Sequence, residues 1–304
     1  MKVSGFTFVR NAVQYDFPVT EAIRSILPIV DEFVVNVGKS EDDTLGLIRS
    51  IGDPKVRIIE NVWDDTKRKD GEIFREQTNL ALDACNGDWA FYLQADEVVH
   101  EEELPRIRAS MEENLGRPGI LGLRFRYLHF YGDYRTLNPW FYRKEIRVIR
   151  NNGKVRSIGD AVGFYCTDDP VVKNLKDGPP DRFVVTGCRI FHYGWVKNPG
   201  TMLEKKIFQT SRHLGMTEEE LRRLIGKGRG AFEAQGLKNW DTVMGVLTKE
   251  WSFDGYDFMK EFRGTHPKVM EERIRGFLPF LSRKRTRWAN PRFYAYVMRH
   301  GFKG

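Results

Sequence analysis

Short apolar runs alternate with helical patterns over the first third of the chain, and this alternation restricts the fold more than any other feature. VSGFTFV at 3–9, FVVNV at 33–37, VRII at 56–59 and WAFYL at 89–93 each predict a buried strand. Between them, apolar residues repeat at helical spacing over 19–27, 45–51 and 73–84. Strands and helices that alternate in this way form right-handed β-α-β units. We therefore expect an α/β fold whose central sheet is mostly parallel and flanked by helices.

The fourth apolar run ends abruptly in the polar segment Gln94-Ala95-Asp96-Glu97. An apolar run without polar alternation predicts a strand that is buried on both faces, and open α/β sheets bind their ligands at the carboxyl ends of such strands. Carboxylates at this place suit Mg²⁺ or Mn²⁺, whose other ligands are water and phosphate oxygens. Acidic residues also favour a helix N-terminus. This segment alone leaves both interpretations open.

Several classes of protein do not fit the sequence. No Gly-x-Gly-x-x-Gly follows the first predicted strand and no Walker-type loop occurs, which argues against a dinucleotide-binding dehydrogenase and a P-loop enzyme. Cys85, Cys166 and Cys188 are too few and too scattered for a disulfide framework or a zinc site, so we expect reduced thiols. The chain has no run near the roughly 20 apolar residues of a membrane span, and its first residues do not form a secretory signal. These observations predict a cytoplasmic location.

The net charge of +7 comes from the C-terminal end. Residues 273–304 hold nine of the 49 Lys and Arg and none of the 42 Asp and Glu, which leaves 40 basic against 42 acidic residues in 1–272. Aromatic residues are interleaved with these cations: Phe277, Phe280, Trp288, Phe293, Tyr294, Tyr296 and Phe302. Such a tail suits peripheral contact with an anionic membrane surface, an anionic acceptor, or packing of a basic helix on the core. Nucleic acid is not expected as a partner, because the body has no basic excess.

Other polar segments fall at the ends of predicted elements: Arg10-Asn11 after the first strand, Asn36-Val37-Gly38 with Asp43-Thr44 after the second, Arg75 and Asn79 before Gly87-Asp88-Trp89, and Arg189-Ile190-Phe191-His192-Tyr193-Gly194-Trp195 followed by Lys205. In order and spacing they resemble the GT-A-fold glycosyltransferases, in particular family-2-like enzymes of lipopolysaccharide core and capsule assembly. Gln94-Ala95-Asp96-Glu97 looks like that family's DxD motif. The resemblance covers about residues 3–215 and implies a GT-A (Rossmann-like) nucleotide-sugar fold. Beyond it, the residue pattern itself predicts a helical C-terminal region.

The resemblance implies that a sugar nucleotide lies across the carboxyl ends of the strands. Its diphosphate would be bridged to Asp96 through Mn²⁺ or Mg²⁺, with His192 as a second metal ligand, since a metal there stabilises charge on the leaving nucleoside diphosphate. For His192 alone, a packing or hydrogen-bonding role at a strand end is the usual expectation, and its place in the motif leaves both roles open. The implied nucleotide-sugar site comprises Val9, Arg10, Asn11, Asn36, Asp43, Arg75, Asn79, Gln94, Ala95, Asp96 and Lys205.

Two positions depart from the family pattern. Asn36 stands where the family usually has an acid that reads the base. Its amide oxygen can accept the imino proton of uracil, so a UDP-sugar is favoured, but its NH₂ group can also face an acceptor. Gln94 replaces the first acid of the DxD motif and removes one formal charge from the metal site. A metal-independent enzyme therefore stays open.

An inverting transfer needs one general base that takes the proton from the acceptor hydroxyl. The stretch from Arg147 to Asp160 looks like the family segment that ends in a His-Glu pair, and Asp160 falls on the acid. We expect Asp160 to be the base, with Glu97 as its rival beside the metal site. The structural alternative for Asp160 is a turn aspartate after Gly159.

Residues 122–164 are dense in aromatic and basic side chains, which stack on sugar rings and pair with phosphate or carboxylate groups. We expect the acceptor there, bound by Trp140, Arg147 and Tyr193, although a β-rich core with a solvated basic face would give the same composition. The domain prediction is a glycosyltransferase domain over 1–215, with a nucleotide-sugar-binding half at 1–120 and an acceptor-binding half at 121–215. A helical extension over 216–304 follows it.

The expected activity is transfer of a hexose from a nucleoside-diphosphate sugar to a glycan or lipid-linked glycan, as in polysaccharide biosynthesis, with inversion and with a divalent metal. A sugar nucleotidyltransferase would share the sheet and the acids, but Phe8-Val9-Arg10-Asn11-Ala12 does not supply its usual glycine-rich loop. A non-catalytic nucleotide- or glycan-binding protein is also kept open by Gln94 and Asn36, because a fold alone does not establish a function.

Overall fold

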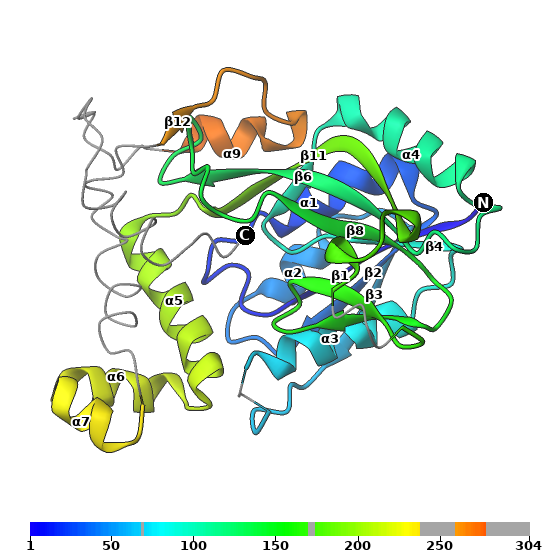
Figure 1. The fold of residues 1–304 in the computed structure, drawn as a ribbon. Helices are drawn as coiled ribbons and strands as arrows, with labels where there is room; N and C mark the ends of the chain where they lie inside the picture. The colour runs from blue at the N-terminus through cyan, green and yellow to red at the C-terminus, as the bar shows by residue number, and fades with distance from the viewer. Residues whose placement is uncertain (68–69, 170–173, 238–258, 278–304) are drawn as a thin grey trace.

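The computed structural model describes residues 1–67, 70–169, 174–237 and 259–277, and a large mixed sheet lies at its centre (Figure 1). The strands are β1 (Val3–Val9), β2 (Glu32–Gly38), β3 (Val56–Asn61), β4 (Trp89–Tyr92), β5 (Glu97–Val99), β6 (Gly122–Tyr131), β7 (Thr136–Leu137), β8 (Lys144–Arg150), β9 (Val155–Ile158), β10 (Gly163–Cys166), β11 (Phe183–Trp195) and β12 (Lys260–Glu261). The sheet order is β12-β7-β6-β8-β4-β1-β2-β3, and β11 pairs with both β6 and β5. β9 and β10 form a separate hairpin.

The first four strands form the parallel part of the sheet. β1 pairs in parallel with β2 on one side and β4 on the other, and β3 follows β2 in the same direction. All four residues of β4 are buried, because this strand lies between β1 and β8. The prediction of an α/β fold with parallel strands is therefore confirmed for this half of the sheet.

The second half makes the sheet mixed. β8 runs antiparallel to both β4 and β6, whereas β11 runs parallel to β6 and antiparallel to the short strand β5. The register places His192 of β11 opposite Glu97 of β5 and opposite His129 of β6. β11 thus brings the late histidine segment beside the end of β4.

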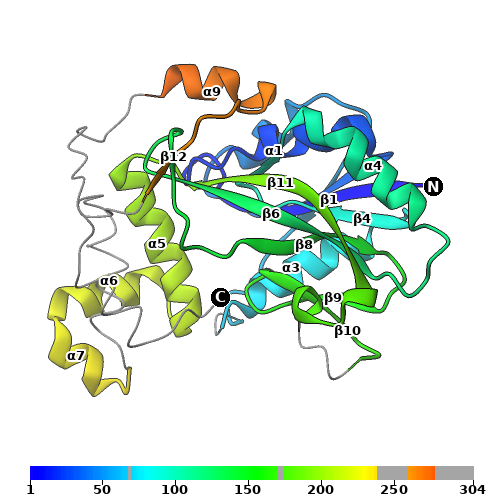
Figure 2. The ribbon, with the colours of Figure 1, turned by 45° about the horizontal axis from the view of Figure 1, so that its top comes forward.

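Helices cover both faces of the sheet (Figures 1 and 2). The α-helices are α1 (Val19–Ile26), α2 (Thr44–Arg49), α3 (Glu72–Asp83), α4 (Leu104–Glu113), α5 (Pro199–Leu214), α6 (Glu218–Lys227), α7 (Arg229–Ala234) and α9 (Glu271–Gly276). Short 3₁₀ helices are η1 (Leu27–Ile29), η2 (Glu101–Glu103), η3 (Leu175–Asp177), η4 (Pro180–Arg182) and η6 (Lys268–Met270). α3 packs on β1 and β2, while α1 contacts β5 and α4 contacts β11 on the other side.

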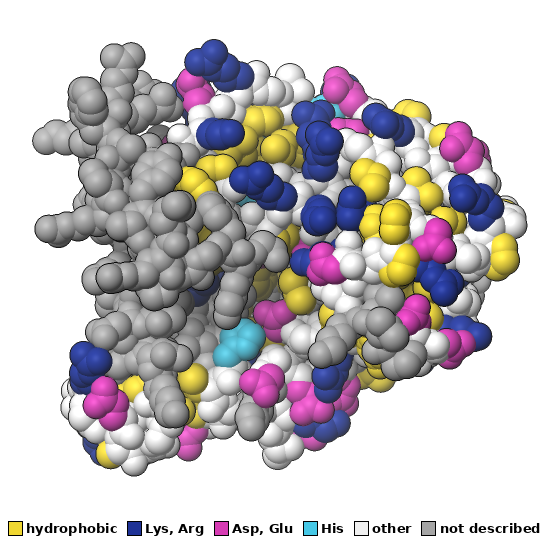
Figure 3. All heavy atoms as spheres, viewed as in Figure 1, with side chains coloured by type: hydrophobic (Ala, Val, Ile, Leu, Met, Phe, Trp, Pro, Cys, Tyr) yellow, Lys and Arg dark blue, Asp and Glu magenta, His cyan; other side chains and the backbone are white. Residues whose placement is uncertain are grey.

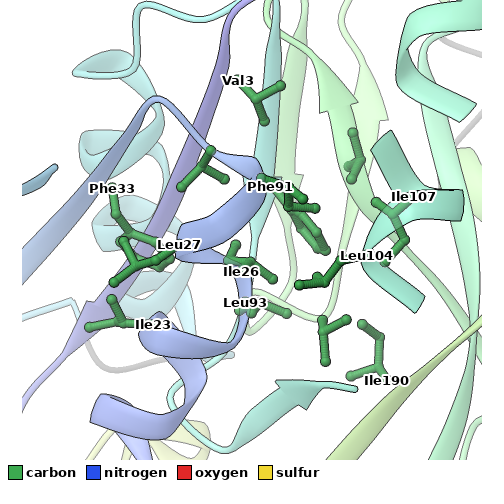
Figure 4. Packing of buried hydrophobic residues seen from close by; sticks show 14 of the residues in the cluster. Val3, Ile23, Ile26, Leu27, Phe33, Phe91, Leu93, Leu104, Ile107 and Ile190 are labelled. Atoms are coloured by element: carbon green, nitrogen blue, oxygen red, sulfur yellow. The ribbon is translucent and has the colours of Figure 1, made fainter. Parts of the chain in front are cut away.

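The largest hydrophobic cluster lies between the sheet and the side that carries α1 and α4. Figure 4 shows Ile26 of α1 and Ile107 of α4 near Phe91 of β4, while Ile23 of α1 lies by Phe33 of β2. A second cluster, which includes Phe6 and Phe74, fills the α3 side. Burial of these apolar residues on both faces holds β4 in place, and the position of Asp96 beyond its end follows from that.

Side-chain caps define the starts of two helices; at α2 the cap is Asp43, and not a capping box that begins at Ser40 as the sequence pattern predicts. The Asp43 side chain accepts a hydrogen bond from the backbone N–H of Gly46 at the start of α2. Thr217 and Glu220 form a reciprocal capping box at the start of α6. These caps satisfy backbone N–H groups that a first helical turn leaves without partners.

The C-terminal part begins with α5, α6 and α7. α5 and α6 share a small hydrophobic cluster that includes Ile207 and Leu221, and the predicted domain boundary at residue 215 falls between them. Arg273, the first residue of the predicted basic tail, is fixed on the body of the protein, because it forms ion pairs with Asp16 and Glu21. The rest of that tail, from 278 on, and the helix that the sequence predicts at 240–251 lie outside the described residues. A further helix predicted at 253–262 is described only from 259 on, and there it is wrong, because Lys260–Glu261 pair with β7 as strand β12. Within the described part, no helix has both the length and the apolar character required to cross a membrane.

Candidate active site

Asp96, His192 and Lys205 converge beyond the carboxyl end of β4, and we call them the Asp96 centre. Asp96 Oδ2 accepts a hydrogen bond from Lys205 Nζ at 2.9 Å, and Asp96 Oδ1 lies 3.7 Å from His192 Nε2. All three residues are buried. Burial alone would raise the pKa of Asp96, but the Lys205 ammonium holds it well below its usual range. Asp96 is therefore a buried, ionised carboxylate.

Three separate segments build this centre. His192 comes from β11, the backbone N–H of Tyr193 donates to the carbonyl oxygen of Asp96 at 2.8 Å, and Lys205 comes from α5. Gly194 makes room for them, because a Cβ atom there would lie 2.7 Å from His192 Cε1 and 3.0 Å from Lys205 Nζ. Lys205 Nζ also donates to the Gly194 carbonyl oxygen at 3.0 Å. The glycine of the late histidine segment thus permits the close approach.

His192 is held as a neutral ring. Burial lowers its pKa from 6.5 in spite of the nearby carboxylate of Asp96. Its Nδ1 atom has no hydrogen-bond partner among the described residues. The His129 ring lies 4.8 Å away, measured between ring centroids, and a neutral imidazole nitrogen is a good ligand for a divalent ion.

Glu97 points the other way, into the core. Its Oε1 accepts hydrogen bonds from Tyr127 Oη and Arg147 Nη2, both at 2.8 Å, and its Oε2 accepts from Arg147 Nε at 2.8 Å and from the Gln94 backbone N–H at 3.1 Å. Glu97 and Arg147 are both fully buried. These four bonds use the roughly four acceptor positions of a carboxylate. The prediction of Glu97 as a rival base does not fit this position, because any proton that it gained would displace one of these bonds.

Gln94 connects the Asp96 segment with the loop that carries Asp160. Gln94 Nε2 donates to the Ala161 carbonyl oxygen at 3.2 Å, so the residue is not directed at Asp96. Asp160 itself is exposed, and its Oδ2 lies 3.6 Å from His213 Nε2 of α5. It sits against Gly71 at the start of α3, where a Cβ atom would lie 2.6 Å from Asp160 Cβ. Asp160 is thus a surface carboxylate on the loop that contacts Gln94.

Asn36 lies at the β2 end of the predicted nucleotide site and is fully buried. Its Nδ2 donates to the Gln77 backbone carbonyl oxygen at 3.0 Å and to Gln77 Oε1 at 2.9 Å. Its Oδ1 has no hydrogen-bond partner among the described residues. The amide group is therefore oriented with its donor toward α3 and its acceptor unused.

The other predicted nucleotide-site residues serve partly as supports. Val9 is buried in the core, and Asn11 Oδ1 accepts a hydrogen bond from the Glu41 backbone N–H at 2.9 Å. Asn79 Oδ1 accepts from the Ser157 backbone N–H at 3.0 Å. Ala95 is buried in the main cluster. These contacts hold the loops that surround the centre.

The charged residues of the predicted nucleotide-sugar site, at the ends of the same strands and helices, differ in their exposure. The guanidinium of Arg10 lies 3.4 Å from Asp65 Oδ1 and 5.4 Å from the centroid of the Trp63 ring. Arg75 is half exposed and pairs with Glu72 one turn away at 3.1 Å. Asp43 caps α2. Of the predicted set, Asp96, His192 and Lys205 are brought into direct contact around one carboxylate.

Two of the three predicted acceptor residues lie in the interior. Arg147 is fully buried in its pair with Glu97, and Tyr193 is 1% exposed, with its hydroxyl 2.8 Å from His266 Nδ1. Acceptor binding does not fit these positions, because a glycan cannot reach either side chain. Trp140 is half-buried in the segment between β7 and β8.

A second buried lysine, Lys197, lies beside the centre and was not predicted. Its Nζ donates to the Asp16 carbonyl oxygen at 2.6 Å, and Lys197 and Lys205 each place Nζ 4.9 Å from the Phe17 ring centroid. Burial, together with the nearby charge of Lys205, lowers the pKa of Lys197 from 10.5 to about 7. No pattern in the sequence distinguishes this lysine, since its partner is 181 residues away along the chain.

Comparisons with known proteins give the following results. No protein-family model matches the chain. An uncharacterized glycosyltransferase of Rickettsia typhi is 23% identical over 232 residues, which is 75% of this chain and 70% of that protein. The resemblance to glycosyltransferases inferred from the motifs is thereby confirmed.

Solved structures with a similar arrangement include TarS of S. aureus, at 14% identity and a TM-score of 0.41, with 69% of this chain and 39% of TarS covered. The chain thus spans well under half the length of TarS. Another is glucosyl-3-phosphoglycerate synthase of Mycobacterium tuberculosis in complex with Mn²⁺, UDP and glucosyl-3-phosphoglycerate, at 14% identity and a TM-score of 0.41, with 71% of this chain and 81% of that chain covered. Because these scores are below 0.5, the fold assignment rests on the strand order itself.

Proposed function

We propose that this chain is a GT-A-type glycosyltransferase that transfers a sugar from a nucleoside-diphosphate donor to a glycan or lipid-linked glycan. One observation carries the proposal: a buried, ionised carboxylate lies beyond the carboxyl end of β4, with a lysine and a neutral histidine in contact with it. Ligands of open α/β sheets bind at such ends. The similarity to the Rickettsia typhi glycosyltransferase supports the same activity.

The donor is proposed to lie across the ends of β1, β2 and β4. A UDP-sugar is the proposed donor, as the motif resemblance implies; Asn36 is fully buried, so its unused Oδ1 does not contact the base as the side chain now stands. Lys205, buried beside Asp96, would place positive charge where the diphosphate leaves, and Lys197, on the same Phe17 ring, would add to that charge when it is protonated. Such fixed charges in a buried site stabilise the charge that develops on a leaving group.

A divalent ion fits this centre as a shared ligand of protein and donor. Asp96 Oδ1 and His192 Nε2 lie 3.7 Å apart and are not hydrogen-bonded to each other, so both can face one cation. Asp96 Oδ2 is taken by Lys205, and no group of three or more His, Cys, Asp or Glu placed for a metal exists within the described part. Asp96 and His192 would therefore hold Mn²⁺ or Mg²⁺ together with phosphate oxygens, and the ion would add charge stabilisation on the leaving diphosphate.

We propose an inverting transfer with Asp160 as the general base. Asp160 is reachable from solvent, and its neighbour Ala161 contacts Gln94, two residues before Asp96. A carboxylate near an acceptor hydroxyl can take its proton as the new bond forms. Glu97 is not proposed as the base, because its oxygens are fully bonded in the core.

The test of the function is calorimetric binding of UDP, GDP, dTDP and CDP, each with Mn²⁺ and with EDTA. We expect one nucleotide, UDP, to bind more tightly with Mn²⁺ than with EDTA. Asp96→Asn is the informative variant, because an amide can still accept a bond from Lys205; its thermal unfolding is measured alongside, since the buried Lys205 charge loses its counter-charge. Asp88→Asn, at the opposite end of β4, is its matched control. Equal binding by wild type and Asp96→Asn, or binding of none of the four, would contradict the proposal.

The base is tested separately. Asp160→Asn is expected to lower kcat by about a hundredfold or more while UDP affinity stays unchanged. Asp168→Asn, another exposed aspartate, serves as the control. If Asp160→Asn keeps full activity, the base is another group and the glycosyltransferase assignment is unaffected.

Peripheral membrane contact is proposed for the basic aromatic tail, of which residues 278–304 lie outside the described ranges. Interleaved aromatic and basic residues suit an anionic lipid surface. Full-length protein should co-sediment with anionic vesicles at low salt, and protein truncated after residue 277 should not. If neither form sediments, the membrane contact does not exist.

A further inference from the structure

A cavity of about 540 Å³ opens along β6, next to the segment that joins β7 to β8. Its lining carries five cationic side chains and no acidic one; the cations are Arg124, Arg126, Arg143, Lys144 and Lys260. Figure 3 shows Lys and Arg side chains gathered on the face where Figure 1 places β6 and β8, with hydrophobic side chains between them. Within the described ranges, none of the five forms an ion pair. Cations without counter-charges in a concave site attract anions.

The strand register makes this charge cluster unfavourable for folding. Arg126 of β6 lies directly opposite Lys144 of β8 on one side and opposite Arg189 of β11 on the other. Like charges that face each other across strands destabilise a sheet. Arg189 is compensated by Glu103 at 2.8 Å, and the nearby Glu145 is buried and bound to Lys176. Arg126 and Lys144 are exposed and have no acidic partner among the described residues. Because they do not stabilise the sheet, their presence is better explained by a ligand that they bind.

The cavity also has aromatic walls, which come from Tyr127, Phe141 and Tyr142. Aromatic faces bind the apolar faces of sugar rings, and arginine forks bind phosphate and carboxylate groups. Its volume falls in the range of about 300–1,000 Å³ that is usual for small-molecule sites. A saccharide that carries negative charge matches both kinds of wall.

His129 connects this cavity with the Asp96 centre. It lines the cavity, its Nε2 lies 2.7 Å from the Tyr142 carbonyl oxygen, and its ring centroid is 4.8 Å from that of His192. Phe141 of the cavity wall stacks on Trp195 at the end of β11, with centroids 4.9 Å apart. The cavity and the centre are therefore separated by the thickness of one side chain.

We propose that this cavity binds an anionic saccharide, the part of the acceptor that carries phosphate or carboxylate groups. That this saccharide is the acceptor rests on the proposed function. The binding of an anionic saccharide to the cavity does not depend on the proposed function. Arg126 and Lys144 contact the anionic groups, and Tyr142 and Phe141 pack against the rings. Neutral glycans of the same length bind more weakly, because they leave the cations unpaired.

The test is titration calorimetry with three oligosaccharides of equal length: a phosphorylated oligomannose, an oligogalacturonate and a neutral maltooligosaccharide. We expect one of the two anionic glycans to bind, with an affinity that falls as salt is raised, and the neutral glycan not to bind. The glycan that binds identifies phosphate or carboxylate as the charged group. Equal binding of all three would overturn the proposal.

The variant that tests the site is Arg126→Gln with Lys144→Gln, and the control is Arg49→Gln with Arg108→Gln, which removes the same charge elsewhere. The site variant should bind the anionic glycan at least about tenfold more weakly, while its thermal midpoint stays unchanged or rises because a like-charge pair is removed. The control should bind like the wild type. A site variant that keeps its glycan affinity would refute the assignment, and so would a single-stranded RNA that binds the cavity as tightly as the glycan.

The two proposals fail in different ways. UDP binding that depends on Asp96, together with no anionic-glycan binding, refutes the cavity assignment and leaves the glycosyltransferase intact. Glycan binding that depends on Arg126 and Lys144, without any nucleotide binding, refutes the proposed activity and leaves an anionic-glycan-binding protein.

Discussion

Replacement of Glu97 by Gln is expected to destabilise the protein strongly, because Glu97 is the centre of a buried hydrogen-bond network. Its carboxylate accepts four hydrogen bonds, from Tyr127, from Gln94 and twice from Arg147, and neither it nor Arg147 is exposed. An amide can accept at one oxygen only, so two of the four donors would lose their acceptor. At about 1–3 kcal/mol for each unsatisfied buried donor, the loss is about 2–6 kcal/mol.

The charge effect gives a similar magnitude. Removing one partner of a buried ion pair leaves the other charge uncompensated, at about 3–5 kcal/mol. We therefore expect Glu97→Gln to lower the free energy of unfolding by about 3–5 kcal/mol, a third or more of the total for many domains. The measurement is urea unfolding followed by circular dichroism. Glu112→Gln, which breaks an exposed pair with Arg108 at 3.0 Å, is the control and should change stability by less than about 0.5 kcal/mol.

A double variant separates a structural role from a chemical one. Glu97→Gln combined with Arg147→Met removes both charges and should recover part of the lost stability, because no guanidinium is then left unpaired. If Glu97→Gln changed stability by less than about 1 kcal/mol and abolished turnover, the assignment of Glu97 to the core would be refuted. Glu97 would then be the better candidate for the base.

Three further outcomes follow from the site and its supports. Lys197 has a folded-state pKa of about 7 against an unfolded value of 10.5, so the unfolded chain binds more protons between these pH values. The free energy of unfolding of the wild type should therefore rise from about pH 7 to about pH 10 relative to Lys197→Met, by up to about 5 kcal/mol at 1.4 kcal/mol per pKa unit. Parallel pH profiles of the two proteins would contradict this. Gly194→Ala should weaken nucleotide binding at least about tenfold, because its Cβ would push Lys205 and His192 away from Asp96. The measurement is calorimetry, and the control is Gly226→Ala, where an added Cβ has no neighbour within 4 Å. Thr217→Ala should lower stability by about 1 kcal/mol through loss of the α6 capping box, and no change in the urea midpoint would show that the cap is not stabilising.

Much of the parallel half of the fold could be predicted from the sequence. The β1, β2, β3 and β4 segments and the helices between them show local periodicity, and Asp43 and Thr217 are caps that a few neighbouring residues specify. The placement of Asp96 and Lys205 in one site was expected only from the resemblance, since the two residues are 109 positions apart, and their direct contact was not predicted. Local patterns predict elements, because propensity and amphipathicity act over one or two helical turns or a few strand residues.

The tertiary structure decided which neighbouring side chains face the site. Asp96 and Glu97 are adjacent, yet Asp96 faces His192 and Lys205 while Glu97 faces Arg147 in the core. Arg147 and Tyr193, expected at the acceptor, are buried in contacts with Glu97 and His266. Local patterns could not predict these contacts, because the partners lie 50 and 73 residues away along the chain. The antiparallel insertion of β8 between β6 and β4 brings Arg147 to Glu97 and also places Lys144 opposite Arg126. The sequence by itself determined the elements and the residue types at their ends, whereas strand pairing over long separations determined which of those residues are buried in pairs and which remain available to a ligand.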